Sequence, residues 1–170
     1  MVAHLALDAQ FFTFLRDCPP SILIVLGDAR LTLASALNAR YDILVLDAFS
    51  SDAIPVHLLT REAFRGYLAK LSPDGVIAVH ISNDHLDLEP VIASVATELG
   101  LAARIRRDLQ IPENDAAEGR TPAVWTILAR SSSDLGELDT AAKWQPVRGR
   151  PDVGVWTDDY SNIIRVFEWR

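Results

Sequence analysis

Three short runs of branched apolar residues, each followed by a segment of helical length, constrain the fold of this chain more than any other feature. The runs are ILIVL at 22–26, ILVL at 43–46 and VIAVHI at 76–81. Continuous apolar runs of this length are typical of strands that are buried on both faces of a sheet. Because they alternate with helical segments, they predict an α/β fold with a doubly wound, mostly parallel sheet and right-handed crossovers.

The later part of the chain predicts antiparallel strands at one edge of this sheet. Two further strands have only a polar loop between them, which predicts a hairpin. The chain is expected to be irregular from about residue 131, and all 170 residues are assigned to a single domain. The predicted helices are 4–16, 31–39, 60–71 and 86–99, the later strands are 102–107, 124–129 and 163–169, the loop is 112–122 and a turn is 72–75.

The composition limits the classes of function. Hydrophobic residues make up 49% of the chain and charged residues 23%, as in soluble globular proteins. The net charge of −7 argues against a nucleic-acid-binding surface and is compatible with a cationic ligand. The single cysteine, Cys18, cannot form an internal disulfide, and no Cys/His cluster has metal-ligand spacing, so no metal is expected. No apolar run is long enough to span a membrane and no leader pattern precedes the first helix, so we expect a cytoplasmic protein.

Two of the apolar runs end in a carboxylate. Asp28 follows Gly27 after the first run, and Asp47 follows the second run directly, with Asp52 shortly after it in the sequence DAFSSD. Open parallel sheets bind ligands outside the carboxyl ends of their strands. These side chains therefore predict a site for a cationic or amine-bearing small molecule.

Several motifs in order resemble one family. GDARL, YDILVLDAFSSDAIPVHLLTREAF, LSPDGVIAVHISN and WTDDYSN closely resemble the spermidine synthase (aminopropyltransferase) family, and more narrowly the bacterial spermidine-synthase-like proteins, which have the S-adenosylmethionine-dependent methyltransferase fold. The resemblance implies that Asp28 and Ala29 contact the adenine of the donor and that Asp47 is the catalytic carboxylate. It implies that Asp52 binds the substrate amine, although Ala48 and Phe49 lengthen the usual spacing.

The resemblance implies transfer of an aminopropyl group from decarboxylated S-adenosylmethionine, or a relative of it, to an amine in polyamine biosynthesis. An amine arrives protonated at neutral pH and cannot attack in that form, so Asp47 would take its proton. Asp52 would pair with a cationic nitrogen. Asp158 and Asp159 would add negative potential, and Tyr160 would offer a hydroxyl or an aromatic face to the cation.

The start of the chain departs from the family pattern. The first strand with its Gly-rich loop, and the acidic residue after the second strand, would precede Met1, and no G-x-G element occurs near the start. We therefore expect a partial domain that lacks the first two strands and half of the donor site. A sheet edge left open at 22–26 would favour a homodimer or larger assembly.

Other interpretations stay open at this stage. The chain could be a non-catalytic remnant or interaction domain, a methyltransferase with another acceptor, or part of a protein that begins upstream. Each candidate side chain also has a structural alternative, as a turn or capping residue for the carboxylates and as a core histidine for His80. Ser82 and Asn83 follow a strand end and could line the same crevice.

Overall fold

The computed structural model describes residues 2–18, 22–48 and 55–168, and it divides the chain into two units, Met1–Ser35 and Ala36–Arg170. The first unit contains three short helices, α1 (Val2–Leu7), α2 (Phe14–Asp17) and α3 (Ala29–Ala34). The predicted helix 4–16 is wrong over its middle. The carboxylate of Asp8 accepts the N–H of Gln10 at 2.9 Å, a local turn that competes with the helix and ends it after α1.

The predicted strand at 22–26 is also wrong. These residues carry no strand, and Leu23 and Leu26 are 86% and 77% exposed. A buried parallel strand needs a hydrogen-bonded neighbour and helices on both faces. The first unit supplies no strand within its described residues, and none of its described side chains is buried.

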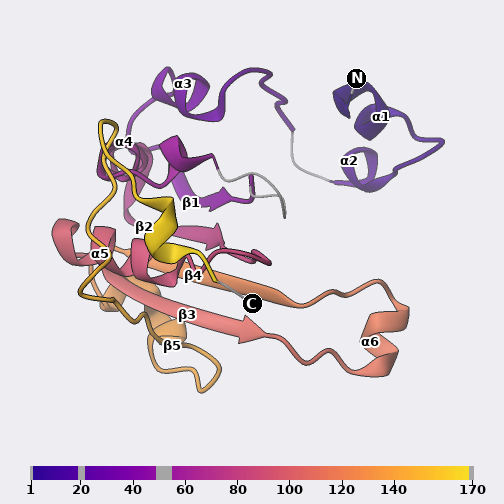
Figure 1. The fold of residues 1–170 in the computed structure, drawn as a ribbon. Coiled ribbons are helices and arrows are strands. Elements are labelled where there is room, and N and C mark those ends of the chain that lie inside the picture. The colour runs from indigo at the N-terminus through magenta and orange to yellow at the C-terminus, as the bar shows by residue number, and fades with distance from the viewer. Residues whose placement is uncertain (1, 19–21, 49–54, 169–170) are drawn as a thin grey trace. The chain divides into compact units, whose positions relative to one another are not determined.

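The second unit is built on one mixed sheet of five strands (Figure 1). The spatial order is β1-β2-β4-β3-β5. β1 pairs with β2 in parallel, while β2/β4, β3/β4 and β3/β5 are antiparallel. The predicted α/β class and the antiparallel strands from the C-terminal part are confirmed. The bounds are β1 Tyr41–Leu46, β2 Leu71–His80, β3 Ala102–Asp108, β4 Ala123–Ala129 and β5 Gln145–Pro146.

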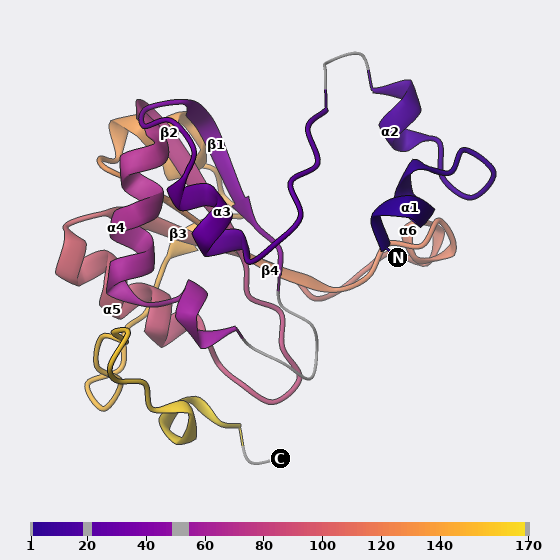
Figure 2. The ribbon, with the colours of Figure 1, turned by 90° about the horizontal axis from the view of Figure 1, so that it is seen from above.

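Two helices, α4 (Arg61–Lys70) and α5 (Glu89–Leu99), lie side by side along one face of the sheet (Figure 2). Thr60 caps α4 by accepting the N–H of Ala63, and Gly100 ends α5 with a left-handed backbone. The sheet residues beneath these helices are almost fully buried, with exposed fractions of 0–1%: Ile77, Val79, Ile105, Thr126 and Leu128.

The opposite face of the sheet is covered only in part. The 3₁₀ segment η2 (Ser133–Asp139) places Leu135 against Ile127 and Ala129 of β4, and Trp144 packs against the same cluster. On β1, Ile43 and Val45 are 63% and 57% exposed. This side is therefore apolar but open beside β1.

Several elements differ from the predictions in extent. The predicted turn at 72–75 belongs to β2, and the predicted helix at 86–99 begins only at Glu89. The loop between β3 and β4 contains α6 (Glu113–Ala117) at its tip (Figure 1). The predicted terminal strand is instead the 3₁₀ segment η3 (Ile163–Val166), because the side chain of Asn162 accepts the N–H of Arg165 and starts a helical turn. A further 3₁₀ segment, η1 (Val56–Leu58), precedes α4.

Of the helices described, none is both long and apolar enough to cross a lipid bilayer.

Candidate functional site

The candidate site lies where β1 and β2 end. Asp47 comes directly after β1, and His80 is the last residue of β2. The parallel register pairs Leu46 with Val79, so the next position on each strand brings Asp47 beside His80. The Asp47 Oδ1 and His80 Nδ1 atoms are 2.7 Å apart.

The imidazole of His80 has a partner on its second nitrogen as well. Its Nε2 atom lies 2.7 Å from the Oγ atom of Ser82. Ser82 Oγ in turn accepts the backbone N–H of Val124 at 2.7 Å. The indole of Trp125 on β4 stacks on the imidazole, with ring centroids 4.8 Å apart and an interplanar angle of 21°. The ring is therefore fixed in position and in orientation.

These contacts decide what the group can do chemically. An ionised carboxylate only accepts hydrogen bonds, so the hydrogen between Asp47 and His80 belongs to Nδ1. The Asp47 side chain is 58% exposed and the His80 side chain 22% exposed. A carboxylate open to solvent at a strand end, backed by an ordered imidazole, suits a cationic ligand that must lose a proton.

Sequence reasoning predicted Asp47 and favoured a satisfied core histidine over a base for His80. Both ring nitrogens do have partners, but the side chain is 22% exposed and one partner is Asp47, so the ring lies at the edge of the core. The missed signal is the register. Two parallel strands that are neighbours in the sheet end together, so the residue that follows 43–46 could have been placed beside the end of 76–81.

Ser82 and Asn83 were the side chains that could line this crevice. Ser82 is bonded to His80, Asn83 accepts the N–H groups of His85 and Leu86, and the lining role stays a prediction.

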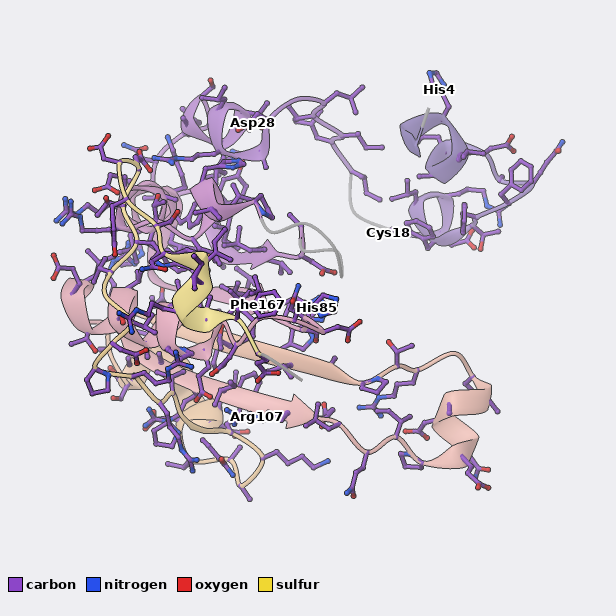
Figure 3. The ribbon with its side chains drawn as sticks, viewed as in Figure 1. His4, Cys18, Asp28, His85, Arg107 and Phe167 are labelled. Carbon is purple, nitrogen blue, oxygen red and sulfur yellow. The ribbon has the colours of Figure 1, made fainter. Side chains whose placement is uncertain are left out.

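Asp28 and Ala29 lie in the first unit. Asp28 is the N-cap of α3, and its Oδ1 atom accepts the N–H of Leu31 at 2.9 Å (Figure 3). Gly27, with a φ of 142°, makes the turn that leads into this cap. A capping bond occupies one carboxylate oxygen, and the predicted contact of Asp28 and Ala29 with adenine stays a prediction.

Asp52, together with Ser50 and Ser51, falls outside the described residues. Its predicted contact with the substrate amine stays a prediction.

The segment around Asp158 is attached to the start of α4. The hydroxyl of Thr60 donates to Asp158 Oδ1 at 2.7 Å, and the N–H of Asp158 donates to Glu62 at 3.0 Å. A hydrogen bond from Arg61 lowers the pKa of Glu62. Asp159 and Tyr160 are exposed in the turn that follows. The predicted contacts of Asp158, Asp159 and Tyr160 with substrate therefore stay predictions, and a structural role for Asp158 is observed.

The C-terminal segment holds the loop that follows β2. The N–H of Asp87 donates to the carbonyl of Val166 at 2.8 Å, and the N–H of Glu168 donates to the carbonyl of His85 at 2.7 Å. The rings of His85 and Phe167 stack with centroids 6.3 Å apart (Figure 3). Burial raises the pKa of Asp87, which lies in this loop. The strand end that carries His80 and Ser82 is thus followed by an anchored loop.

In the part of the chain that the structure describes, no group of three or more His, Cys, Asp or Glu side chains is placed to hold a metal ion.

No family model matches this chain. An N-terminal histidine N-methyltransferase from Emericella nidulans is 33% identical to it over an alignment of 103 residues, and the match covers 57% of this chain and 18% of that protein. The chain therefore spans less than a fifth of the length of this curated relative.

Among solved structures, a probable spermidine synthase from Corynebacterium glutamicum aligns with a TM-score of 0.59 and 19% sequence identity, over 94% of this chain and 61% of that one. A spermidine synthase from Thermotoga maritima aligns with a TM-score of 0.47 and 12% identity, over 95% of this chain and 50% of that one. The first likeness shows the fold: the chain has a Rossmann-like methyltransferase fold.

Proposed function

We propose that this chain belongs to a transferase that moves an aminopropyl group from decarboxylated S-adenosylmethionine, or a close relative of it, to an amine. The single observation that carries the proposal is the contact between Asp47 and His80 at the ends of two neighbouring strands. The methyltransferase-like fold and the likeness to spermidine synthases support the class of donor. The whole protein's activity is part of the proposal, because the chain spans only part of its relatives.

The chemistry of such a transfer fits the site. The amine nitrogen attacks the carbon next to the sulfonium, that carbon–sulfur bond breaks, and a neutral thioether leaves. Amines of this kind have pKa values near 10 and are protonated at neutral pH. A proton acceptor within hydrogen-bond reach must free the nitrogen lone pair first. Asp47 lies at an open strand end, where its carboxylate would hold a cationic nitrogen of the substrate amine.

The remaining predicted side chains complete the proposal. Asp52 would pair with a second cationic nitrogen, with Asp158, Asp159 and Tyr160 adding to the acceptor side. Asp28 and Ala29 would contact the adenine of the donor. A carboxylate accepts from an exocyclic amine, and a backbone N–H at the start of a helix has no acceptor inside that helix. The homodimer was expected because of an open sheet edge at 22–26. No strand forms there, so that argument for a dimer does not apply.

A second candidate is methyl transfer from S-adenosylmethionine to an amine nitrogen. It is favoured by the 33% identity to a histidine N-methyltransferase over 57% of this chain. Both reactions move an alkyl group from a sulfonium to nitrogen and both need the amine deprotonated. The donor carbon, and not the proton acceptor, distinguishes them.

A transfer assay tests both candidates together. The purified chain is incubated with a diamine and either decarboxylated S-adenosylmethionine or S-adenosylmethionine, and mass spectrometry of the amine shows whether an aminopropyl or a methyl group was added. We expect aminopropyl transfer, with Asp47→Asn reducing kcat/KM by roughly 10²–10⁴-fold. The matched control is Asp74→Asn, which changes an exposed carboxylate at the other end of β2. Equal activity of Asp47→Asn and the wild type would contradict the proposal.

A further inference from the structure

His80 is held more completely than the positioning of Asp47 alone requires. One bond from Nδ1 is enough to orient a carboxylate, yet Nε2 is bonded to Ser82 and the ring face is stacked on Trp125. Ser82 is itself fixed by the N–H of Val124. The result is a continuous chain of hydrogen bonds from β1 through β2 to β4.

Ser82 is suited to either charge state of the ring. Its hydroxyl has one hydrogen and two lone pairs, and the N–H of Val124 uses one lone pair. With a neutral ring, the hydroxyl donates to Nε2. With an imidazolium, Nε2–H donates to the hydroxyl oxygen, and the hydroxyl hydrogen is released to another acceptor. His80 can therefore gain a proton without losing a partner on either nitrogen.

We propose that Asp47, His80 and Ser82 form a proton relay in which His80 stores, at Nε2, the proton that a bound ammonium group loses. The inference rests on the proposed function, because it names the proton acceptor for the amine that the transferase alkylates. The N–H bond of the ammonium breaks and its proton goes to Ser82 Oγ, while the hydroxyl proton of Ser82 goes to His80 Nε2. The nitrogen keeps the electron pair with which it attacks.

The charges balance throughout this step. One positive charge moves from the ammonium to the imidazole, and the Asp47 carboxylate lies 2.7 Å from the Nδ1 side of the resulting imidazolium. After the transfer the Nε2 proton returns through Ser82 Oγ to solvent, which restores the ring with its hydrogen on Nδ1. His80 and Ser82 are catalytic residues in this scheme, and Asp47 holds the ring in the tautomer that leaves Nε2 free to accept.

The charged groups that face the ring in the described structure are few. Asp47 faces it from β1. Beyond Trp125, the antiparallel register places Arg106 of β3 on the same face of the sheet, with Asp108 two residues further along. Arg106 Nε and Asp108 Oδ2 are 2.8 Å apart, and Arg120 Nη2 lies 3.7 Å from the same oxygen, so these charged groups pair with one another.

The tautomer of His80 is the first test, and it needs no activity. In a protein labelled with ¹⁵N-histidine, long-range ¹H–¹⁵N spectra distinguish the two neutral tautomers, and His80→Asn identifies the His80 signals among the four histidines. We expect the hydrogen on Nδ1 at alkaline pH. A ring with its hydrogen on Nε2 would overturn the relay, because such a ring cannot accept a proton from Ser82.

The second test is the pH dependence of kcat/KM for amine transfer. The amide of His80→Asn places an N–H near the position of Nδ1–H, so the bond to Asp47 is kept. The amide cannot be protonated, so the site that holds the proton is removed. We expect a loss of roughly 10²–10⁴-fold at pH 7 that shrinks about tenfold per pH unit as the amine deprotonates in solution. For Ser82→Ala we expect the loss of kcat/KM to shrink with rising pH in the same way.

The outcomes separate the relay from the proposed function. If the wild type transfers the group and His80→Asn matches it, or loses the same factor at every pH, the relay is overturned and the proposed function stands. If the wild type transfers nothing, both are overturned. Circular dichroism and the urea midpoint of each variant exclude loss of folding as the cause, and the tautomer measurement uses the wild-type protein.

Discussion

Replacement of Glu89 should destabilise the second unit by an amount that the structure allows us to estimate. Glu89 is in the first turn of α5, and its side chain is only 11% exposed. One carboxylate oxygen accepts the N–H of Arg148 at 2.8 Å, and the other pairs with the guanidinium of Arg107 on β3. Glu89 thus joins three segments that are far apart in the sequence.

Three contributions to the free energy of unfolding are lost in Glu89→Ala. Leaving the partly buried N–H of Arg148 without its acceptor costs about 1–2 kcal/mol. The ion pair contributes only about 1 kcal/mol, because Arg107 is 33% exposed and water would solvate it. A negative charge at the start of a helix adds about 0.3–1 kcal/mol. We expect a total loss of about 2–4 kcal/mol, and about 1–2 kcal/mol for Glu89→Gln, which keeps an acceptor for Arg148.

Urea unfolding followed by tryptophan fluorescence measures these differences in the free energy of unfolding. Glu98→Ala is the matched control in the same helix. Glu98 is 42% exposed and pairs with Arg61 at 3.5 Å, so its loss should cost less than about 0.5 kcal/mol. A value for Glu89→Ala within 0.5 kcal/mol of the wild type, or equal losses for the two alanine variants, would refute the reasoning.

Two glycines and one half-buried aspartate give further predictions. Gly66→Ala should stabilise α4 by up to about 1 kcal/mol, because a Cβ there meets nothing, whereas Gly75→Ala should cost about 1–3 kcal/mol, because its Cβ would lie 3.0 Å from the carbonyls of Tyr41 and Asp42. Urea unfolding of both variants checks the pair, and a stabilised Gly75→Ala would contradict it. The raised pKa of Asp87 means that the folded state resists ionisation, so stability falls as pH rises from the ordinary value of 3.8 through the raised one. Asp87→Asn should therefore unfold at a higher temperature than the wild type at pH 7, and the difference in unfolding temperature should disappear near pH 3. A difference that does not change with pH would contradict the raised pKa of Asp87.

The sheet could be predicted where the sequence pattern and the pairing agree. β1, β3 and β4 lie within a few residues of the predicted strands, because each has neighbours that complete its hydrogen bonds. The run at 22–26 has the same apolar pattern and forms no strand. Apolarity alone says that a segment prefers burial, but a strand also needs a partner, which the local sequence does not specify.

Only part of the candidate site could be predicted, because the local sequence does not specify which strands pair. Asp47 follows a strand, which is a local feature, and its position at a strand end is as expected. The partner of Asp47 is His80, 33 residues away, and the partner of Asp158 is Thr60, 98 residues away. Such pairs depend on strand register and on the path of the tail, and local patterns contain neither.

Calorimetric titration of the purified chain with decarboxylated S-adenosylmethionine tests the central claim most directly, because a transferase of this kind must bind its donor. S-adenosylmethionine and methylthioadenosine serve as comparison ligands, and Asp47→Asn as the variant that should keep donor binding while losing transfer. The account predicts saturable binding of the decarboxylated donor in the micromolar range, equivalent to about −8 kcal/mol. No heat of binding up to millimolar ligand would contradict it.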